Sequence, residues 1–298
     1  MKITKNIPYF LIISLIVLSC IPETGPHNPS DYELDISIST DKYPAVSRDG
    51  LLIAYFHQSL EYPEPTDYPT GLYVMNSDGT NRRLMLKGRH FDPNWSPDNQ
   101  WLVFTSEGIL QIINIAGDSI RTYPGINNVP LFYPDWSPDG RLILFSSPFV
   151  NGGGGFICSA DFNVTKQIYN QYTFNAYPIK WFSSTEFIGS RYFESNLSEE
   201  IFIVDTTLSN PTRLTFNDKS DRDPEGSPSH EYIAWSSNVR IFRMNKDGSG
   251  QKMLDYGQYP CWTPDSKNIV YSNANSDVTK EVIWRIDIDG KNKIQLTY

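Results

Sequence analysis

A seven-residue phrase recurs along this chain of 298 residues. It reads PNWSPDN at 93–99, PDWSPDG at 134–140 and PCWTPDS at 260–266. In each copy a Pro followed by Asp and a small or polar residue favours a tight turn, because Pro presets φ and such residues tolerate turn conformations. Repetition at a period of about 40 residues is typical of an array of similar structural units. The phrase therefore constrains the fold more strongly than composition does.

Six prolines share the place of the leading Pro: Pro44, Pro93, Pro134, Pro178, Pro224 and Pro260. Each is followed by a turn and then by three short runs rich in β-branched and aromatic residues, such as WLVFTS at 101–106. Six units of four strands predict an all-β fold, a six-bladed β-propeller with four-stranded antiparallel blades. We expect Trp95, Trp136 and Trp262 to fill the gaps between blades. The fourth unit shifts its Trp by one position, to Trp181.

The repeat also carries a family resemblance. The order P-x-W-S-P-D-G, an apolar strand, a strand ending N-x-D-G and a closing L-T resembles the PD40 (WD40-like) repeat of TolB-type propellers, over residues 43–298. The resemblance implies a TolB-like propeller and says little about function, because one fold hosts many functions. TolB has an extra N-terminal α/β domain, whereas about two dozen residues separate Cys20 from the first repeat here. The G-x-S-x-G motif of propeller-bearing hydrolases is absent from this sequence.

The first residues predict secretion. Two lysines precede an apolar run at 7–18, which is shorter than the roughly 20 residues of a membrane-spanning helix. We therefore interpret 1–19 as a signal peptide. The sequence Leu-Ser-Cys at its end resembles the lipobox of bacterial lipoproteins, which implies that Cys20 is lipidated. A plain signal peptide followed by a chance Cys is the alternative.

The resemblance to lipoproteins implies a location in the bacterial cell envelope. Residues 20–30 hold the modified Cys20 and a Pro-rich stretch that we interpret as a flexible tether. No acidic residue follows Cys20 directly, which by sorting rules favours the outer membrane, facing either the periplasm or the outside. The lipid anchor is the only membrane contact that we expect.

The propeller is predicted to occupy residues 31–298. Its first segment, DYELDISIST at 31–40, alternates apolar and polar residues as a strand does. We expect this strand to join the last blade and help to close the ring. Whether it replaces or supplements the C-terminal run KIQLT at 293–297 stays open.

The sequence offers no evident catalytic or metal site. It has 25 basic and 34 acidic residues, which argues against a nucleic-acid partner. His57, His90 and His230 are not spaced as metal ligands, and the Asp-rich turns lack the calcium-loop pattern. Cys158 and Cys261 fall in opposite blades, too far apart for a disulfide, and we expect both to be buried. We therefore predict no cofactor, no metal and no catalytic residues, without excluding enzyme activity.

One face of the predicted ring carries the long connections. The second-to-third loops at 58–70, 147–155, 191–200 and 273–281 share it with the links between blades. Long variable loops are where binding residues concentrate. Large side chains beside the leading prolines are expected to ring the channel mouth on that face: Tyr43, Phe91, Tyr133, Tyr177, Arg222 and Tyr259. The alternative is that these side chains pack against neighbouring blades.

These features predict a monomeric, lipid-anchored, non-enzymatic module that binds an envelope protein through its long-loop face. The alternative is a propeller that binds or degrades carbohydrate, as a lyase does, at the channel mouth. Clustered carboxylates or histidines and a deep open pocket favour the alternative, whereas a plugged channel favours a protein partner.

Overall fold

The computed structural model describes residues 39–61, 63–147, 154–170, 176–193, 198–275 and 280–298. All elements within these ranges are β-strands, and none of the described residues forms a helix that could cross a membrane. The predicted signal peptide (1–19), the predicted lipidation site Cys20 with its tether (20–30) and most of the predicted N-terminal strand (31–38) lie outside the described residues.

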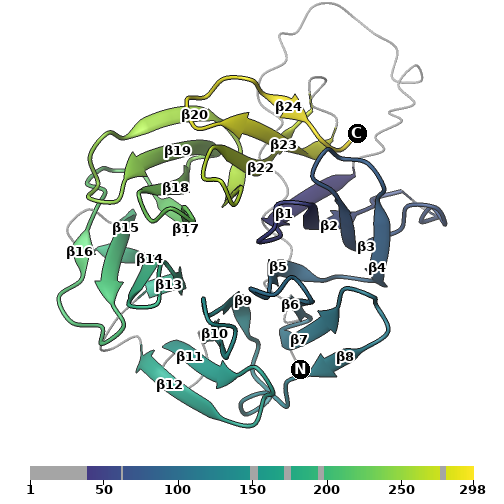
Figure 1. Cartoon of the computed structure of the whole chain (residues 1–298), viewed down its shortest axis with the longest axis horizontal. Helices are drawn as coiled ribbons and strands as arrows, with labels where there is room; N and C mark the ends of the chain where they lie inside the picture. Colours follow the sequence, from purple (N-terminus) through teal and green to yellow (C-terminus); the bar gives the residue numbers. More distant parts are fainter. Residues whose placement is uncertain (1–38, 62, 148–153, 171–175, 194–197, 276–279) are drawn as a thin grey trace, which may run out of the picture. The chain divides into compact units, whose positions relative to one another are not determined.

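We call each set of four consecutive strands a blade (Figure 1). Blade 1 consists of β1 (Thr40–Val46), β2 (Leu52–Gln58), β3 (Gly71–Asn76) and β4 (Arg83–Lys87). Blade 2 consists of β5 (Phe91–Trp95), β6 (Trp101–Ser106), β7 (Ile109–Asn114) and β8 (Ile120–Thr122). Blade 3 consists of β9 (Phe132–Trp136), β10 (Leu142–Ser147), β11 (Gly154–Ser159) and β12 (Thr165–Asn170).

The second half of the chain repeats this arrangement. Blade 4 consists of β13 (Ala176–Trp181), β14 (Glu186–Phe193), β15 (Ser198–Asp205) and β16 (Thr212–Arg213). Blade 5 consists of β17 (Asp221–Gly226), β18 (Tyr232–Ser237), β19 (Arg240–Asn245) and β20 (Lys252–Tyr256). Blade 6 consists of β21 (Gln258–Trp262), β22 (Asn268–Ala274), β23 (Glu281–Asp287) and β24 (Ile294–Gln295).

The fold is the all-β propeller of four-stranded antiparallel blades that the repeat predicts, with one difference in how the blades are joined. Blades 2, 3, 4 and 5 are separate sheets, whereas blades 6 and 1 share one eight-stranded sheet. The link is a single parallel pair between Thr40 of β1 and Glu281 of β23, and the Glu281 N–H donates to the Ser39 carbonyl oxygen (3.2 Å). The strand at 31–40 is predicted to join the last blade; residues 31–38 lie outside the described residues, and within the described part Thr40, at the start of β1, pairs with the last blade.

The repeated phrase is a self-contained hydrogen-bonded turn. The Ser137 hydroxyl donates to the Asp139 carboxylate (2.7 Å), which accepts the Arg141 N–H (3.1 Å). The same Ser and Asp pairing occurs in blade 2, where the Ser96 hydroxyl donates to Asp98 (2.5 Å). Blade 6 uses Thr263 in the same role, with Asp265 (2.6 Å). The recurrence of Ser/Thr-Pro-Asp therefore has a local cause, since the side chains satisfy the turn between the first two strands.

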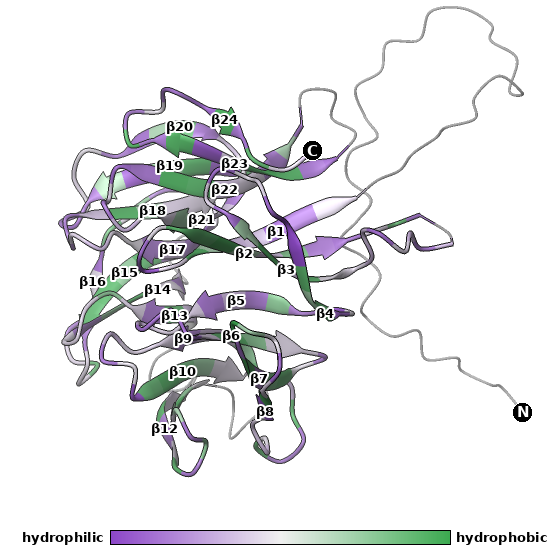
Figure 2. Cartoon of the chain, turned by 45° about the vertical axis from the view of Figure 1, so that its right-hand side comes forward, coloured by the Kyte–Doolittle hydropathy of each residue, from purple (hydrophilic) through white to green (hydrophobic). Residues whose placement is uncertain are grey.

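The hydrophobic core is divided among the junctions between blades. The described residues form six clusters of buried side chains, and each cluster combines residues from two neighbouring blades. Trp95, Trp136 and Trp262 are 1–4% exposed and lie in three of these clusters, as predicted. In Figure 2 the second strands β2 and β10 are coloured largely hydrophobic, whereas the first strands β1 and β5 are more hydrophilic. The first strands thus leave polar groups for the centre.

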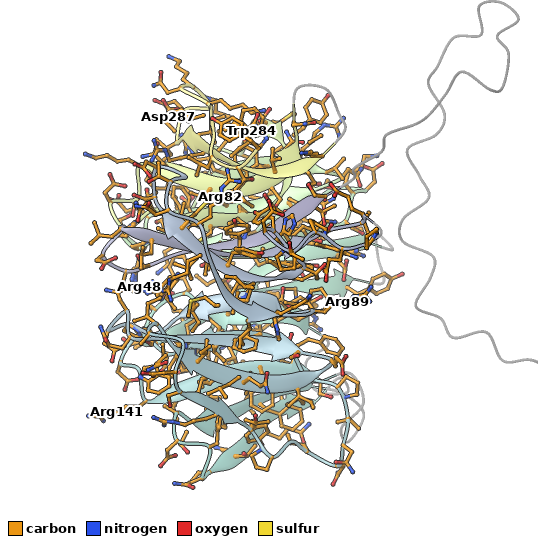
Figure 3. The ribbon with its side chains drawn as sticks, turned by 90° about the vertical axis from the view of Figure 1, so that its right-hand side faces the viewer. Arg48, Arg82, Arg89, Arg141, Trp284 and Asp287 are labelled. Atoms are coloured by element: carbon orange, nitrogen blue, oxygen red, sulfur yellow. The ribbon has the colours of Figure 1, made fainter. Side chains whose placement is uncertain are left out.

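The two faces of the propeller carry different connections. Because strands alternate in direction, the first-to-second and third-to-fourth turns lie on one face, which we call the turn face. The second-to-third loops and the links between blades lie on the other, the loop face. Figure 3 shows Arg48 and Arg141 from first-to-second turns on one side and Arg89 from a link between blades on the other.

Candidate binding site at the centre of the propeller

A β-bulge interrupts the first strand of every blade at the leading Pro. Register with the second strand shifts at this point in all six blades. The residues directly before the prolines have φ between 51° and 56° in five blades: Tyr43, Asp92, Tyr133, Asp223 and Tyr259. This left-handed conformation is uncommon for residues other than Gly, and bulges re-aim side chains next to functional sites.

These five residues line a cavity of about 90 Å³ at the centre of the ring. The cavity is also lined by Lys180, Glu225 and Cys261, and its lining includes residues from all six blades. Arg48 and Pro228, which belong to first-to-second turns, also line it. In every blade, the lining residues begin at or after the residue that directly precedes the leading Pro. The described cavity therefore runs from the pre-proline ring toward the turn face, whereas the sequence placed the site at the loop-face mouth.

The ring differs in composition from the predicted one. Tyr43, Tyr133 and Tyr259 are brought together, and Asp92 and Asp223 occupy the places assigned to Phe91 and Arg222. The prediction took large residues two positions before the Pro in blades 2 and 5, whereas the bulge turns the adjacent residue inward. Aligning strictly on the residue before each Pro would have found both carboxylates.

The residues left out of the ring have other contacts. The Phe91 ring packs against Phe56 (centroids 4.9 Å apart) and meets Tyr43 edge-on (6.1 Å). The Arg222 guanidinium is largely exposed and pairs with the Glu199 carboxylate of β15. Tyr177 lies in β13, and its side chain is outside the described part of the structure.

The tyrosines narrow the channel. The Tyr43 and Tyr259 rings, from blades 1 and 6, lie 4.3 Å apart between centroids. Burial raises the pKa of Tyr43, Tyr133 and Tyr259 above the usual value for a phenol. All three therefore stay protonated near neutral pH and can donate or accept hydrogen bonds.

Carboxylates from several blades gather beside this ring. Burial raises the pKa of Asp92 to about 7, against the opposing attraction of the Lys180 ammonium. Burial likewise raises the pKa of Asp223 to about 6. For Asp135, burial and then the neighbouring Glu225 charge raise the pKa to about 6. The Asp135 carboxylate accepts hydrogen bonds from the Asn94 amide (2.7 Å) and the Trp181 N–H (2.6 Å).

The Lys180 ammonium lies among these acids. The Lys180 Nζ is 2.5 Å from the Glu225 carboxylate and joins blade 4 to blade 5. Burial opposes the charge of this ammonium, but attraction to Glu225 and Asp135 outweighs it, so the pKa of Lys180 is raised. A lysine held in its charged form is a poor nucleophile. The side chain thus acts as an internal counterion that partly fills the channel.

The histidines and cysteines have separate surroundings. His57 is buried and bonded to Asp41 (2.7 Å), His90 contacts the Lys87 carbonyl oxygen (3.1 Å), and His230 packs edge-on against Phe182. Among the described residues, no three His, Cys, Asp or Glu side chains are grouped to hold a metal ion. Cys158 is buried and free as expected, whereas Cys261 is only half-buried and lines the channel.

The cavity can hold a small polar group but not a large ligand. Pockets for small-molecule ligands usually measure about 300–1,000 Å³, well above the 90 Å³ here. Tyrosine hydroxyls and carboxylates suit water molecules or a single cationic or hydrogen-bonding side chain. The site therefore has the chemistry of a contact point more than that of an enclosed active site.

Comparison with known proteins agrees with this fold. Residues 53–298 match the family described as PD40, TolB beta propeller domain. The uncharacterized protein Atu1656 of Agrobacterium fabrum is 24% identical over 240 residues, covering 67% of this chain and 73% of that protein.

Solved structures give the same result. A TolB-like protein from Agrobacterium tumefaciens has a TM-score of 0.62 at 22% identity, over 72% of this chain and 84% of that one. TolB from Acinetobacter baumannii has a TM-score of 0.67 at 15% identity, over 88% of this chain and 64% of that one. An oligogalacturonate lyase in complex with manganese has a TM-score of 0.59 at 10% identity, over 88% and 78%. Because the family match spans most of the sequence, this chain belongs to the PD40 family of TolB β-propeller domains.

Proposed function

We propose that this chain is a monomeric, non-enzymatic, protein-binding propeller of six blades, held in the bacterial cell envelope by a lipid on Cys20. It presents its loop face to a protein partner. The outer membrane is the proposed site of anchoring, on the grounds of the residues that follow Cys20. Membership of the TolB propeller family supports an envelope location.

The distribution of exposed apolar side chains carries the choice of face. Of the large hydrophobic side chains that are exposed among the described residues, seven lie on the loop face: Leu60, Ile109, Tyr192, Phe216, Val239, Tyr256 and Tyr298. Two, Leu51 and Val164, lie on the turn face. The remainder belong to the outermost strands. Exposed apolar groups gathered on one face mark interaction surfaces.

Aromatic residues on this face are paired with arginines. Phe216 is 71% exposed, and the Arg213 guanidinium lies 4.5 Å from its ring centroid. Tyr256 is 54% exposed and lies 5.3 Å from the Arg240 guanidinium. Aromatic and Arg side chains are the commonest anchors at protein interfaces. Phe216 follows the fourth strand of blade 4 by a few residues, and Tyr256 ends the fourth strand of blade 5, so one partner can contact both neighbouring blades.

The carbohydrate alternative is favoured by one observation and opposed by another. Carboxylates do cluster in the channel, as a carbohydrate-processing site requires. However, the cavity of about 90 Å³ is too small for an oligosaccharide, and the Lys180–Glu225 ion pair partly fills it. We therefore rank protein binding first.

A paired substitution tests the proposed face. We would compare capture of envelope proteins, after crosslinking in detergent, by wild type, by Phe216→Ser/Tyr256→Ser and by the matched turn-face control Leu51→Ser/Val164→Ser. All four positions are exposed, so both variants should fold with unchanged Tm. Loss of two anchors should weaken binding of a purified partner by at least about tenfold.

Comparison with the turn-face variant shows which face binds the partner. A partner that is retained by the turn-face variant and lost by the loop-face variant supports the proposal. Loss with the turn-face variant alone places the interface on the opposite face. Release of the mature protein from membranes by Cys20→Ser checks the anchor separately.

A further inference from the structure

The central channel holds two carboxylates that lack a fixed counterion. Four acids line or border the cavity: Asp92, Asp135, Asp223 and Glu225. The Lys180 ammonium pairs with Glu225 (2.5 Å), and Asp135 is buried and hydrogen-bonded. Neither Asp92 nor Asp223 forms an ion pair with another described residue. These two carboxylates therefore face the cavity with their charge uncompensated.

Asp92 and Asp223 approach the centre from opposite blades. They belong to blades 2 and 5, whose first strands β5 and β17 lie on opposite sides of the channel (Figure 1). Burial raises the pKa of Asp92 to about 7 against the attraction of Lys180, and the charge of Asp223 adds to the rise. Like charges repel when no cation separates them, so a cation bound between the two carboxylates would relieve this repulsion.

Phenol rings border the space between these carboxylates. Tyr43 and Tyr259 come from blades 1 and 6 on one side, and Tyr133 comes from blade 3 on the other. After burial, the charges of Asp92 and Asp223 are the next causes that raise the pKa of Tyr133, so its hydroxyl lies near both acids. All five side chains are half-buried and keep surface that a ligand can contact. Phenol oxygens accept hydrogen bonds, and aromatic faces attract cations.

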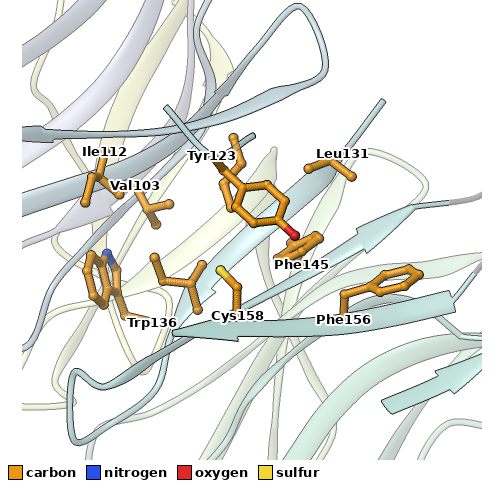
Figure 4. Close-up of a cluster of buried hydrophobic side chains, with 10 residues drawn as sticks. Val103, Ile112, Tyr123, Leu131, Trp136, Phe145, Phe156 and Cys158 are labelled. Atoms are coloured by element: carbon orange, nitrogen blue, oxygen red, sulfur yellow. The ribbon is translucent and has the colours of Figure 1, made fainter. Parts of the chain in front are cut away.

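The size of the cavity limits the ligand to a few heavy atoms. Apolar side chains fill the junctions between blades, as around Phe145 and Cys158 (Figure 4), so the polar space is confined to the centre. The central cavity of about 90 Å³ reaches the turn face, where Arg48 is exposed, and a solute can enter from that side. Because a water molecule takes up about 30 Å³, the cavity suits a small polar ion.

The lining distinguishes between kinds of cation. A primary ammonium group has three N–H donors, which match Asp92, Asp223 and one phenol oxygen. A quaternary ammonium group has no donor to offer. A metal ion needs several converging ligands, and among the described residues no three His, Cys, Asp or Glu side chains are grouped to hold one. The arrangement therefore favours an organic ammonium ion with free N–H groups.

We propose that the central channel binds a small primary alkylammonium ion between Asp92 and Asp223. The ammonium group donates to both carboxylates and to a tyrosine hydroxyl, and its short alkyl chain lies in the rest of the cavity. This site does not use the loop-face anchors Phe216 and Tyr256, so it stands or falls independently of the proposed protein partner.

Binding is tested by NMR titration of the full chain with ethylammonium chloride at constant ionic strength. We expect the backbone amide signals of Asp92, Tyr133 and Asp223 to shift at millimolar concentrations. Tetramethylammonium and Ca²⁺ serve as comparison ions and should bind more weakly. Nα-acetyl-lysine amide carries the same ammonium group on a peptide-like unit, and it should also bind more weakly, because the cavity is small.

Substitutions of the two carboxylates test their role. Asp92→Asn keeps the shape of the side chain and removes its charge, so it should weaken ethylammonium binding at least about tenfold. Asp223→Asn, at the opposite carboxylate, should have a similar effect. The control Asp289→Asn removes a charge from an exposed turn and should leave the affinity unchanged. Thermal unfolding of each variant shows that the fold is retained.

The pH dependence of binding gives a second readout. Burial raises the pKa of Asp92 to about 7 and that of Asp223 to about 6, so both lose their charge as the pH falls. The affinity for ethylammonium should therefore drop at least about tenfold between pH 8 and pH 5. Absence of binding by wild type, unchanged affinity in both Asn variants, an affinity independent of pH, or tighter binding of any comparison compound would each overturn the proposal.

Discussion

At the scale of single residues, the centre of the propeller depends on a repeated backbone conformation. Residues such as Tyr133 and Asp92 have positive φ directly before a Pro. The left-handed region costs a non-Gly residue about 1–2 kcal/mol. The conformation persists because the following Pro and the bulge fix the strand on both sides. The five side chains share the channel because all are held in this way.

This strain predicts a reversed order of stability for two substitutions at Tyr133. Gly normally destabilises a strand relative to Ala, but here φ is 54°. We expect Tyr133→Gly to be more stable than Tyr133→Ala by about 1 kcal/mol in urea unfolding. At Phe132, which lies in an extended strand, the usual order should hold, so Phe132→Ala should be more stable than Phe132→Gly. If Tyr133→Ala is as stable as Tyr133→Gly or more stable, the backbone at Tyr133 is not strained.

At the scale of elements, the blades differ in how they fill the junctions between them. Blades 2, 3 and 6 place a Trp two residues after the leading Pro, whereas blade 5 has Gly226 there. A Cβ on Gly226 would lie 2.5 Å from the Phe182 ring of blade 4. Phe182 is 5% exposed and belongs to the cluster between blades 4 and 5. The neighbouring blade thus supplies the aromatic ring that blade 5 lacks.

A double-mutant cycle tests this exchange. Gly226→Ala should destabilise the protein by about 1–3 kcal/mol, because the added methyl group forces a well-packed ring to move. In a Phe182→Leu background the same change should cost clearly less, which gives a coupling energy of the kind expected for contacting residues. Denaturant unfolding of the four proteins measures it. Additive effects would show that Phe182 does not fill this position.

At the scale of the whole molecule, the acidic channel is a product of ring closure. Asp92, Asp135 and Asp223 come from blades 2, 3 and 5, and each has a pKa raised by burial. The folded protein therefore binds protons that the unfolded chain releases above about pH 4. These groups make the free energy of unfolding fall as pH rises from about 4 to about 7.

Neutralising one of these acids should weaken the dependence of the free energy of unfolding on pH. Asp92→Asn keeps the shape and an acceptor oxygen, so we expect it to stabilise the protein by about 1–2 kcal/mol near pH 8 and by little near pH 5. Urea unfolding of wild type and variant at both pH values measures the difference. The exposed control Asp289→Asn should leave the difference between the two pH values as in wild type. A variant that is destabilised most at high pH would contradict the assignment.

The locally built parts of this protein follow from the amino-acid sequence alone. Strands, turns and the Ser-Pro-Asp phrase follow from neighbouring residues, since the hydrogen bonds of Ser137 and Asp139 close within five positions. The positions of the Trp side chains between blades also follow from the sequence, because the repeat places Trp at the same distance from the leading Pro.

Which side chains meet at the centre and at the junctions between blades depends on the folded ring. The β-bulge at Pro93 decides whether Phe91 or Asp92 faces the channel. The sequence does not show this bulge, which shifts the register by one residue. The merging of blades 6 and 1 depends on the pairing of Thr40 with Glu281, which lie near opposite ends of the sequence. Only closure of the ring brings such remote residues together.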